Sequence, residues 1–289
     1  MTQRPHRWPA PLALVASLLL PLAVSVASIS RAQPTLLANE FNRGLPLPDL
    51  RDRIGPIAPS LPVTVQAGQF RILNADEDDL WSNGDEPYLF IAAVFADGST
   101  ISAQTLSSSS VRIKSPLKTH GNLGTGHKGT GTYTVPASTG SFSTSIRPIA
   151  GVGTEIGKKL ATVALIVVAM DEDGTPTSAM DKARNAFVST LQQELDQSVR
   201  TLKEPDIDAI SSRLQTAMVA AVKSDLVASP SGFLGGLLGA LDPDDVIGTG
   251  VRTVSYEAIE SAGSAGIPFS LPFKKSGVHY VLDGRIRTP

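Results

Sequence analysis

The hydrophobic pattern of the chain changes period twice, and this change limits the fold more than any other feature. Towards both ends of the chain, short apolar segments such as Phe70–Leu73 and Tyr88–Phe95 are separated by Gly, Ser and Pro, which is typical of a β-sandwich. Between about residues 175 and 241, apolar residues recur at helical spacing instead. We therefore predict a mainly β protein, a single antiparallel sandwich interrupted by an insertion.

The strand pattern begins at residue 63 and continues to residue 289, apart from the insertion. The pair Asp97-Gly98 predicts a tight hairpin turn after the second strand. Further predicted strands are Ser110–Lys114, Thr132–Val135, Ser141–Ile149, Leu160–Met170, Val251–Ile259, Ile267–Phe273 and His279–Arg287.

The helical spacing within the insertion predicts two helices. A capping pattern, Ser178-x-x-Asp181, opens the first periodic segment, and Pro205 opens the second, where a missing N–H costs nothing. A short connection between two helices forms an αα-hairpin. We expect it to be packed by Met180, Phe187, Leu191, Ile210, Leu214 and Met218. We also expect that a short linker in place of residues 176–240 leaves a folded β domain.

The N-terminus has the pattern of an export signal. Arg4, His6 and Arg7 precede an apolar stretch from Leu12 to Ala27, and small residues follow. The stretch contains Pro21 and is shorter than the ~20 residues that a membrane span needs. We predict a signal peptide at residues 1–32, cleaved after residue 27 or 32, and hence a secreted or periplasmic protein. An uncleaved membrane anchor is the alternative.

Residues 33–62 contain six prolines and predict an extended linker. Removal of residues 1–32 takes away three arginines and no acid, which leaves 22 basic against 27 acidic residues. A mildly acidic chain without a basic run argues against a nucleic-acid partner. Because the chain has no cysteine, disulfides, thiol nucleophiles and cysteine-ligated zinc are excluded.

Acidic residues are concentrated at strand ends. Twelve of the 27 carboxylates lie in the segments 76–86, 171–173 and 242–245, each next to a predicted strand. Carboxylates at strand ends can converge at one tip of a sandwich, and Ca²⁺ takes six to eight oxygen ligands. The alternative is that these acids are solvated turn residues, since Asp also favours turns.

The acidic segments carry a family resemblance. The run from Val168 to Gly174, Val-Ala-Met-Asp-Glu-Asp-Gly, resembles the strand and Asp-x-Asp that open the third loop of a C2 domain, and Asp245-Val-Ile-Gly resembles its close. Upstream, the Asp-x5-Asp pattern before Pro87-Tyr88 resembles the first loop. The resemblance implies a C2-like calcium-binding β-sandwich with the ligands Asp79, Asp85, Asp171, Asp173 and Asp245.

Two departures from the C2 pattern leave questions open. Glu86 stands between the expected Asp and Pro, so either Asp85 or Glu86 takes the ligand position. The third loop here contains the whole insertion, so Asp173 and Asp245 converge only if the hairpin leaves and returns at nearly the same point. Loop-closure entropy grows slowly with length and permits this.

The remaining motifs are weaker evidence for other functions. The sequence from Gly124 to Gly129 spells G-x-G-x-x-G, but a strand-like segment follows in place of a helix, so we predict no nucleotide site. His120 and His127 lack a third ligand for a transition metal. Paired carboxylates leave a secreted hydrolase as an alternative. The apolar segment 233–241 leaves a membrane-inserting effector as another.

Together these patterns predict an exported, non-catalytic calcium-binding module. C2 domains commonly dock on phospholipid through the bound ion, so the resemblance implies a membrane lipid or another anionic surface as partner. In an exported protein that surface could also be a polysaccharide or a protein.

Overall fold

The computed structural model describes residues 60–74, 87–117, 121–123, 130–171, 177–203, 205–228, 245–275 and 277–289. The predicted signal peptide and most of the predicted linker lie outside these residues. So do the G-x-G-x-x-G segment and the apolar segment 233–241.

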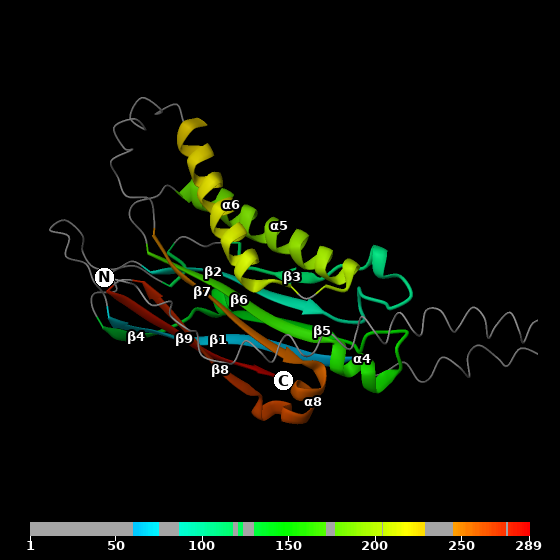
Figure 1. Ribbon diagram of the computed structural model, residues 1–289. Coiled ribbons are helices and arrows are strands. Elements are labelled where there is room, and N and C mark those ends of the chain that lie inside the picture. The colour runs from blue at the N-terminus through cyan, green and yellow to red at the C-terminus, as the bar shows by residue number, and fades with distance from the viewer. Residues whose placement is uncertain are drawn as a thin grey trace, which may run out of the picture.

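Two antiparallel sheets form the body of the molecule (Figure 1). Sheet A has the order β4-β1-β9-β8, and β5 also pairs with β1; sheet B has the order β3-β2-β6-β7. The strands of sheet A are β1 (Leu61–Asn74), β4 (Gly131–Thr134), β5 (Ser141–Ile146), β8 (Ile267–Lys275) and β9 (Val278–Arg287). Those of sheet B are β2 (Tyr88–Ala96), β3 (Arg112–Lys114), β6 (Thr162–Asp171) and β7 (Asp245–Ser255). The predicted antiparallel sandwich is confirmed.

The two sheets differ in how they bury their strands. In β1 buried and exposed residues largely alternate, and Val63, Val65 and Phe70 point into the core at 0–1% exposure. Such alternation is typical of a sheet with one face in solvent. Eight of the nine residues of β2 are buried, which requires cover on both faces.

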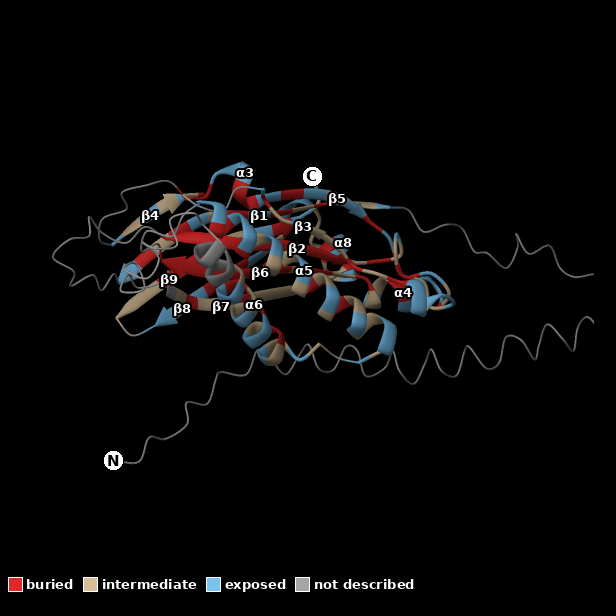
Figure 2. Cartoon of the chain, turned by 90° about the horizontal axis from the view of Figure 1, so that it is seen from above, coloured by how far each residue is buried: buried red, intermediate tan, exposed pale blue. Residues whose placement is uncertain are grey.

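The helical hairpin supplies that second cover for sheet B (Figure 1). It consists of α5 (Thr177–Thr201) and α6 (Ile207–Ala228), close to the predicted bounds. The Phe187 ring lies 5.9 Å from that of Phe90, and the Tyr88 hydroxyl donates to Met180 Sδ at 3.0 Å. Figure 2 shows exposed residues along the outward surfaces of both helices and buried ones in the sheets beneath. All six predicted packing residues are buried: Met180, Phe187, Leu191, Ile210, Leu214 and Met218.

The hairpin is therefore a third layer of the core, and this revises the expectation that it can be removed. Without it, the rings of Tyr88 and Phe90 on sheet B, now at most 1% exposed, would meet water. Burial of one large apolar side chain contributes about 1.5–3 kcal/mol, so exposure of these two rings alone would cost about 3–6 kcal/mol, a large part of the roughly 5–15 kcal/mol that stabilises a typical domain.

Three local predictions were wrong or incomplete. The strand predicted at Val251–Ile259 ends at Ser255, whose hydroxyl caps α8 (Tyr256–Ala262) by accepting from the Ala258 N–H at 3.2 Å. The turn at Asp97 does not form a two-residue hairpin, because a connection containing η1 (Leu106–Ser108) precedes β3. The helix α4 (Thr154–Leu160) was not predicted. The remaining short elements are α3 (Ala137–Gly140) and η2 (Gly263–Ala265).

Candidate functional site

One end of the sandwich gathers the strand ends that the acidic segments flank; we call it the acidic tip. In sheet B, Tyr88 at the start of β2 pairs with Met170, and Asp171 at the end of β6 pairs with Asp245 at the start of β7. In sheet A, the end of β1 at Asn74 pairs with His279 at the start of β9.

The packing between the sheets places these strand ends together. A Cβ built on Gly248 of β7 would lie 3.7 Å from Phe273 Cα in β8. Phe273 in turn pairs with Tyr280, and Tyr280 pairs with Ile72 near the end of β1. The connection from Asn74 to β2 and the connection from Asp171 to β7 therefore leave the sandwich at the same end.

Asp171 is the predicted ligand whose side chain the structure describes. It is the last residue of β6 and is only 8% exposed. A register shift between Ala169 and Met170 aligns Asp171 with Asp245 across the ladder. The 73 residues that contain the hairpin therefore begin and end at two strand positions that are paired with each other. Convergence of the acidic residues requires such an arrangement.

The other predicted ligands are less fully placed. Asp79, Asp85 and Asp173, together with Glu86, lie outside the described residues, and the side chain of Asp245 does too. Within the described part of the chain, no three His, Cys, Asp or Glu side chains form a metal-binding group. The five-ligand site therefore stays a prediction, with its strand ends at one tip.

Positive charge lies at the same end of sheet A. Lys274 and Lys275 end β8 and are exposed, and His279 pairs with Lys274. Burial lowers the pKa of His279 below 6.5, and the charges of Lys274 and Arg71 lower it further. At neutral pH His279 is thus a mostly uncharged imidazole near the cations Lys274 and Arg71. Lys274 and Lys275 thus end β8 of sheet A at the same end of the sandwich at which Asp171 ends β6 of sheet B.

Comparison with known proteins does not identify a function for the acidic tip. No protein-family model matches the chain, and no curated protein matches it significantly.

The most buried charge in the described residues is Asp97, which the sequence analysis had placed in a turn without predicting its burial. It is 0% exposed and follows β2 at the end of that strand opposite the acidic tip. Its Oδ2 accepts from the Arg147 N–H at 2.8 Å and the Ser99 hydroxyl at 2.7 Å, and its Oδ1 accepts from Arg112 Nη2 at 2.7 Å.

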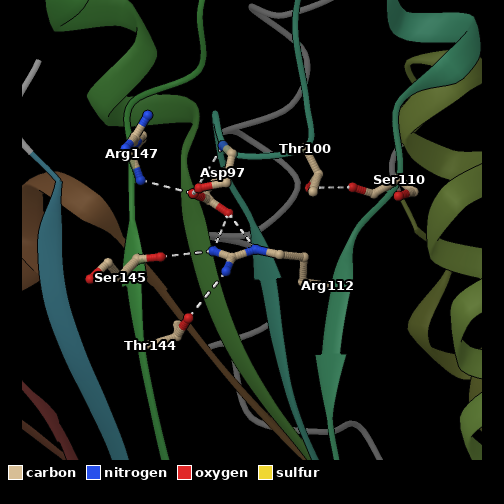
Figure 3. Close-up of polar contacts among 8 residues, drawn as sticks. Asp97, Thr100, Ser110, Arg112, Thr144, Ser145 and Arg147 are labelled. Atoms are coloured by element: carbon tan, nitrogen blue, oxygen red, sulfur yellow. Dashed lines mark hydrogen bonds and ion pairs between the residues drawn. The ribbon is translucent and has the colours of Figure 1, made fainter. Parts of the chain in front are cut away.

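Arg112 extends this network to the neighbouring sheet. Its Nη1 donates to Thr144 Oγ1 at 3.1 Å, and its Nη2 donates to the Ser145 carbonyl at 2.9 Å (Figure 3). Arg112 thus joins β3 to β5, and both oxygens of Asp97 already accept hydrogen bonds within the fold. The only sequence signal for it was an Asp after a wholly apolar strand.

A cavity of about 920 Å³ lies between β3, α3 and α5. Among the described residues that line it, Lys114 and Arg184 are the cations and none is a carboxylate. Lys114 Nζ donates to the Ser143 carbonyl at 2.6 Å and Arg184 Nε donates to the Pro116 carbonyl at 3.1 Å, so both cations are hydrogen-bonded to backbone carbonyls.

None of the described helices is both long and apolar enough to cross a bilayer.

Proposed function

We propose that this chain is an exported, non-catalytic module that binds Ca²⁺ at the acidic tip and docks on an anionic surface. One observation supports the proposal most: Asp171 and Asp245 are register partners, although 73 residues separate them. The connection that carries Asp79 and Asp85 joins Asn74 to Tyr88 at the same tip.

Physical chemistry favours a cation at such a place. Like charges directly opposite each other on neighbouring strands destabilise a sheet. Two unit charges 4 Å apart cost about 4 kcal/mol at an effective dielectric constant of about 20. A divalent ion removes this repulsion, and the buried position of Asp171 suits a ligand better than a solvated turn acid. Oxygen donors at this tip select a hard cation such as Ca²⁺.

The C2-type resemblance agrees with this arrangement. It requires the first and third loops to emerge at one end, and the strand ends at Asn74, Tyr88, Asp171 and Asp245 meet that requirement. The export of the protein, which is part of this proposal, is supported by the N-terminal sequence pattern alone. The hydrolase and membrane-inserting alternatives likewise depend on sequence patterns alone.

Thermal unfolding of the full chain tests the proposal. Extracellular modules bind Ca²⁺ with a Kd of about 10⁻⁴–10⁻³ M. A tenfold excess over Kd should stabilise the fold by about 1.4 kcal/mol, or roughly 3–6 °C in Tm. The double variant Asp171→Asn/Asp173→Asn should lose this response. Its apo form should be no less stable than the parent, because two repelling charges have gone.

The matched control is Asp206→Asn/Asp208→Asn, which removes two carboxylates at the start of α6, at some distance in sequence from the tip. This variant should keep the full calcium response. If Ca²⁺ raises the Tm of the parent and of the Asp171/Asp173 variant equally, these acids are not calcium ligands and are solvated turn residues instead.

A further inference from the structure

Sheet A carries most of the positive charge of the described strands. Its five strands contain one acid, Asp283, against the cations Arg71, Lys274, Lys275, Arg285 and Arg287. The chain without residues 1–32 has five more acidic than basic residues. Positive charge is therefore concentrated on this sheet in an otherwise acidic protein.

The strand register places the arginines in one polar field. Arg285 and Arg287 are exposed, while Ile286 between them is buried at 0%. Gln66 pairs with Arg285 and Thr64 with Arg287, and residues directly opposite in a sheet share a face. The next strand, β5, continues these two rows with Ser141 and Ser143. We call this set of residues the arginine face: Thr64, Gln66, Ser141, Ser143, Arg285 and Arg287.

The single acid on this side of sheet A is already neutralised. Arg71 Nε donates to Asp283 Oδ2 at 2.6 Å. Burial alone would raise the pKa of Asp283, but the hydrogen bonds from Arg71 and Ser270 outweigh it and lower the pKa below 3.8. Arg71 and Asp283 thus compensate each other, and Arg285 and Arg287 stay available to a partner.

The two arginine stems are held in place by the turn before β8. Gly266 has φ +67°, and a Cβ on it would lie 2.5 Å from Arg287 Cβ and 2.9 Å from Arg285 Cγ. The turn backbone therefore packs against both side chains, and Arg285 also donates to the Ala265 carbonyl. Side chains ordered in advance lose less entropy when they bind a partner.

A shallow depression gives this face its shape. It measures about 380 Å³ and is lined by Gln66, Gln69, Asp283, Arg285 and Arg287, with the glycines at 68 and 284. Arginine pairs with carboxylate, sulfate or phosphate through two parallel hydrogen bonds. The hydroxyl and amide groups beside the arginines can donate to and accept from sugar hydroxyls.

We propose that the arginine face binds an acidic polysaccharide, that is, an extended sugar chain that bears carboxylate or sulfate groups. A lipid bilayer fits this face less well, because docking there gains from apolar side chains that enter the interface. Among the described residues, the large exposed apolar side chains are Leu73, Leu117, Ile156 and Val219, and none belongs to the arginine face. This inference does not depend on calcium at the acidic tip.

The test measures binding of the full chain to polygalacturonate and dextran sulfate, with neutral dextran and phosphatidylglycerol vesicles as comparisons. All arms contain a calcium chelator, so failure of this inference and failure of the calcium proposal are distinguishable. We expect binding to the two acidic polysaccharides alone, with an affinity that falls as salt rises. The variant Arg285→Gln/Arg287→Gln should bind at least about tenfold more weakly and with a smaller salt slope.

The matched control is Lys159→Gln/Lys203→Gln, which changes the net charge equally on α4 and after α5. It should bind like the parent. If both variants bind equally weakly, the interaction depends only on the net charge of the protein, and the proposal is overturned. An unchanged Arg285/Arg287 variant, no binding in chelator, or binding to vesicles alone would overturn it as well. A calcium-free melting curve of each variant shows that it is folded.

Discussion

Replacement of Arg112 by Gln should destabilise the protein far more than its position on a three-residue strand would suggest. Arg112 is the cationic partner of a carboxylate that is 0% exposed, and its ring contact with Phe95, at 5.6 Å, adds a cation–π interaction. Loss of one partner from a buried ion pair costs about 3–5 kcal/mol. The lower end of that range applies here. Arg112 is 29% exposed, and Asp97 keeps donors from Ser99 and the Arg147 N–H.

We therefore expect Arg112→Gln to lower the free energy of unfolding by about 3 kcal/mol. Urea unfolding at pH 7, followed by circular dichroism, measures this change. Arg112→Lys should fall between the parent and Arg112→Gln, since it keeps the charge but loses the fork that reaches Thr144 and Ser145. The control is Arg213→Gln, because Arg213 pairs with Glu194 at 2.8 Å but is 51% exposed. This control should cost at most about 1 kcal/mol. Equal losses in Arg112→Gln and Arg213→Gln would refute the structural role of the buried pair.

Three further outcomes follow from the fold. Phe187→Ala should cost about 3–5 kcal/mol in urea unfolding, whereas Val219→Ala on the exposed side of α6 should change stability by less than about 0.5 kcal/mol; similar values would contradict the three-layer core. A short linker in place of residues 177–228 should give a product without cooperative unfolding, and a cooperative β-rich product would show that the hairpin is dispensable. The pKa of Asp283 is lower in the folded than in the unfolded state, so its contribution exists above about pH 4 and disappears as the pH falls further. Asp283→Asn should therefore cost about 0.5–1 kcal/mol at pH 7 and progressively less as the pH falls below about 4, and a loss that does not change with pH would count against the pairing with Arg71.

The elements with a clear hydrophobic period could be predicted from the sequence. The helical spacing of Met180, Phe187 and Leu191 indicated both the hairpin and the residues that it buries. The apolar residues Val63 and Val65 indicated the start of a strand, and both are buried in β1. Periodicity reports which face of an element is apolar, and here it was sufficient.

Periodicity does not report what covers that face. The continuous apolar run of β2 is consistent with any doubly covered strand, and only the tertiary fold shows that the hairpin is its cover. The helix at Tyr256 was missed for a related reason. Tyr256 and Ile259 are buried in a short helix, and three-residue spacing over seven residues is too short to distinguish from a strand.

The candidate site was predictable in part. Short motifs around Asp171 and Asp245 suggested that both lie at one tip, and the register pairing agrees. The Asp97–Arg112 pair could not be predicted, since its members lie fifteen positions apart in the sequence and burial of an acid depends on the packing of both sheets. The arginine face was equally hidden, because Gln66 and Arg285 meet only through the register of β1 and β9.

The most direct test of the central claim, a calcium site at the acidic tip, is terbium luminescence excited through Trp81. This tryptophan lies between Asp79 and Asp85 in the sequence, and Tb³⁺ is a luminescent substitute for Ca²⁺ at oxygen sites. If the loops converge on one ion, Tb³⁺ emission should appear, should fall in Trp81→Phe, and should decrease as Ca²⁺ displaces the lanthanide. It should also be lost in Asp171→Asn/Asp173→Asn, although these positions are ninety or more residues from Trp81 in the sequence. Emission through Trp81 that this double variant leaves unchanged would contradict a shared site and the calcium proposal with it.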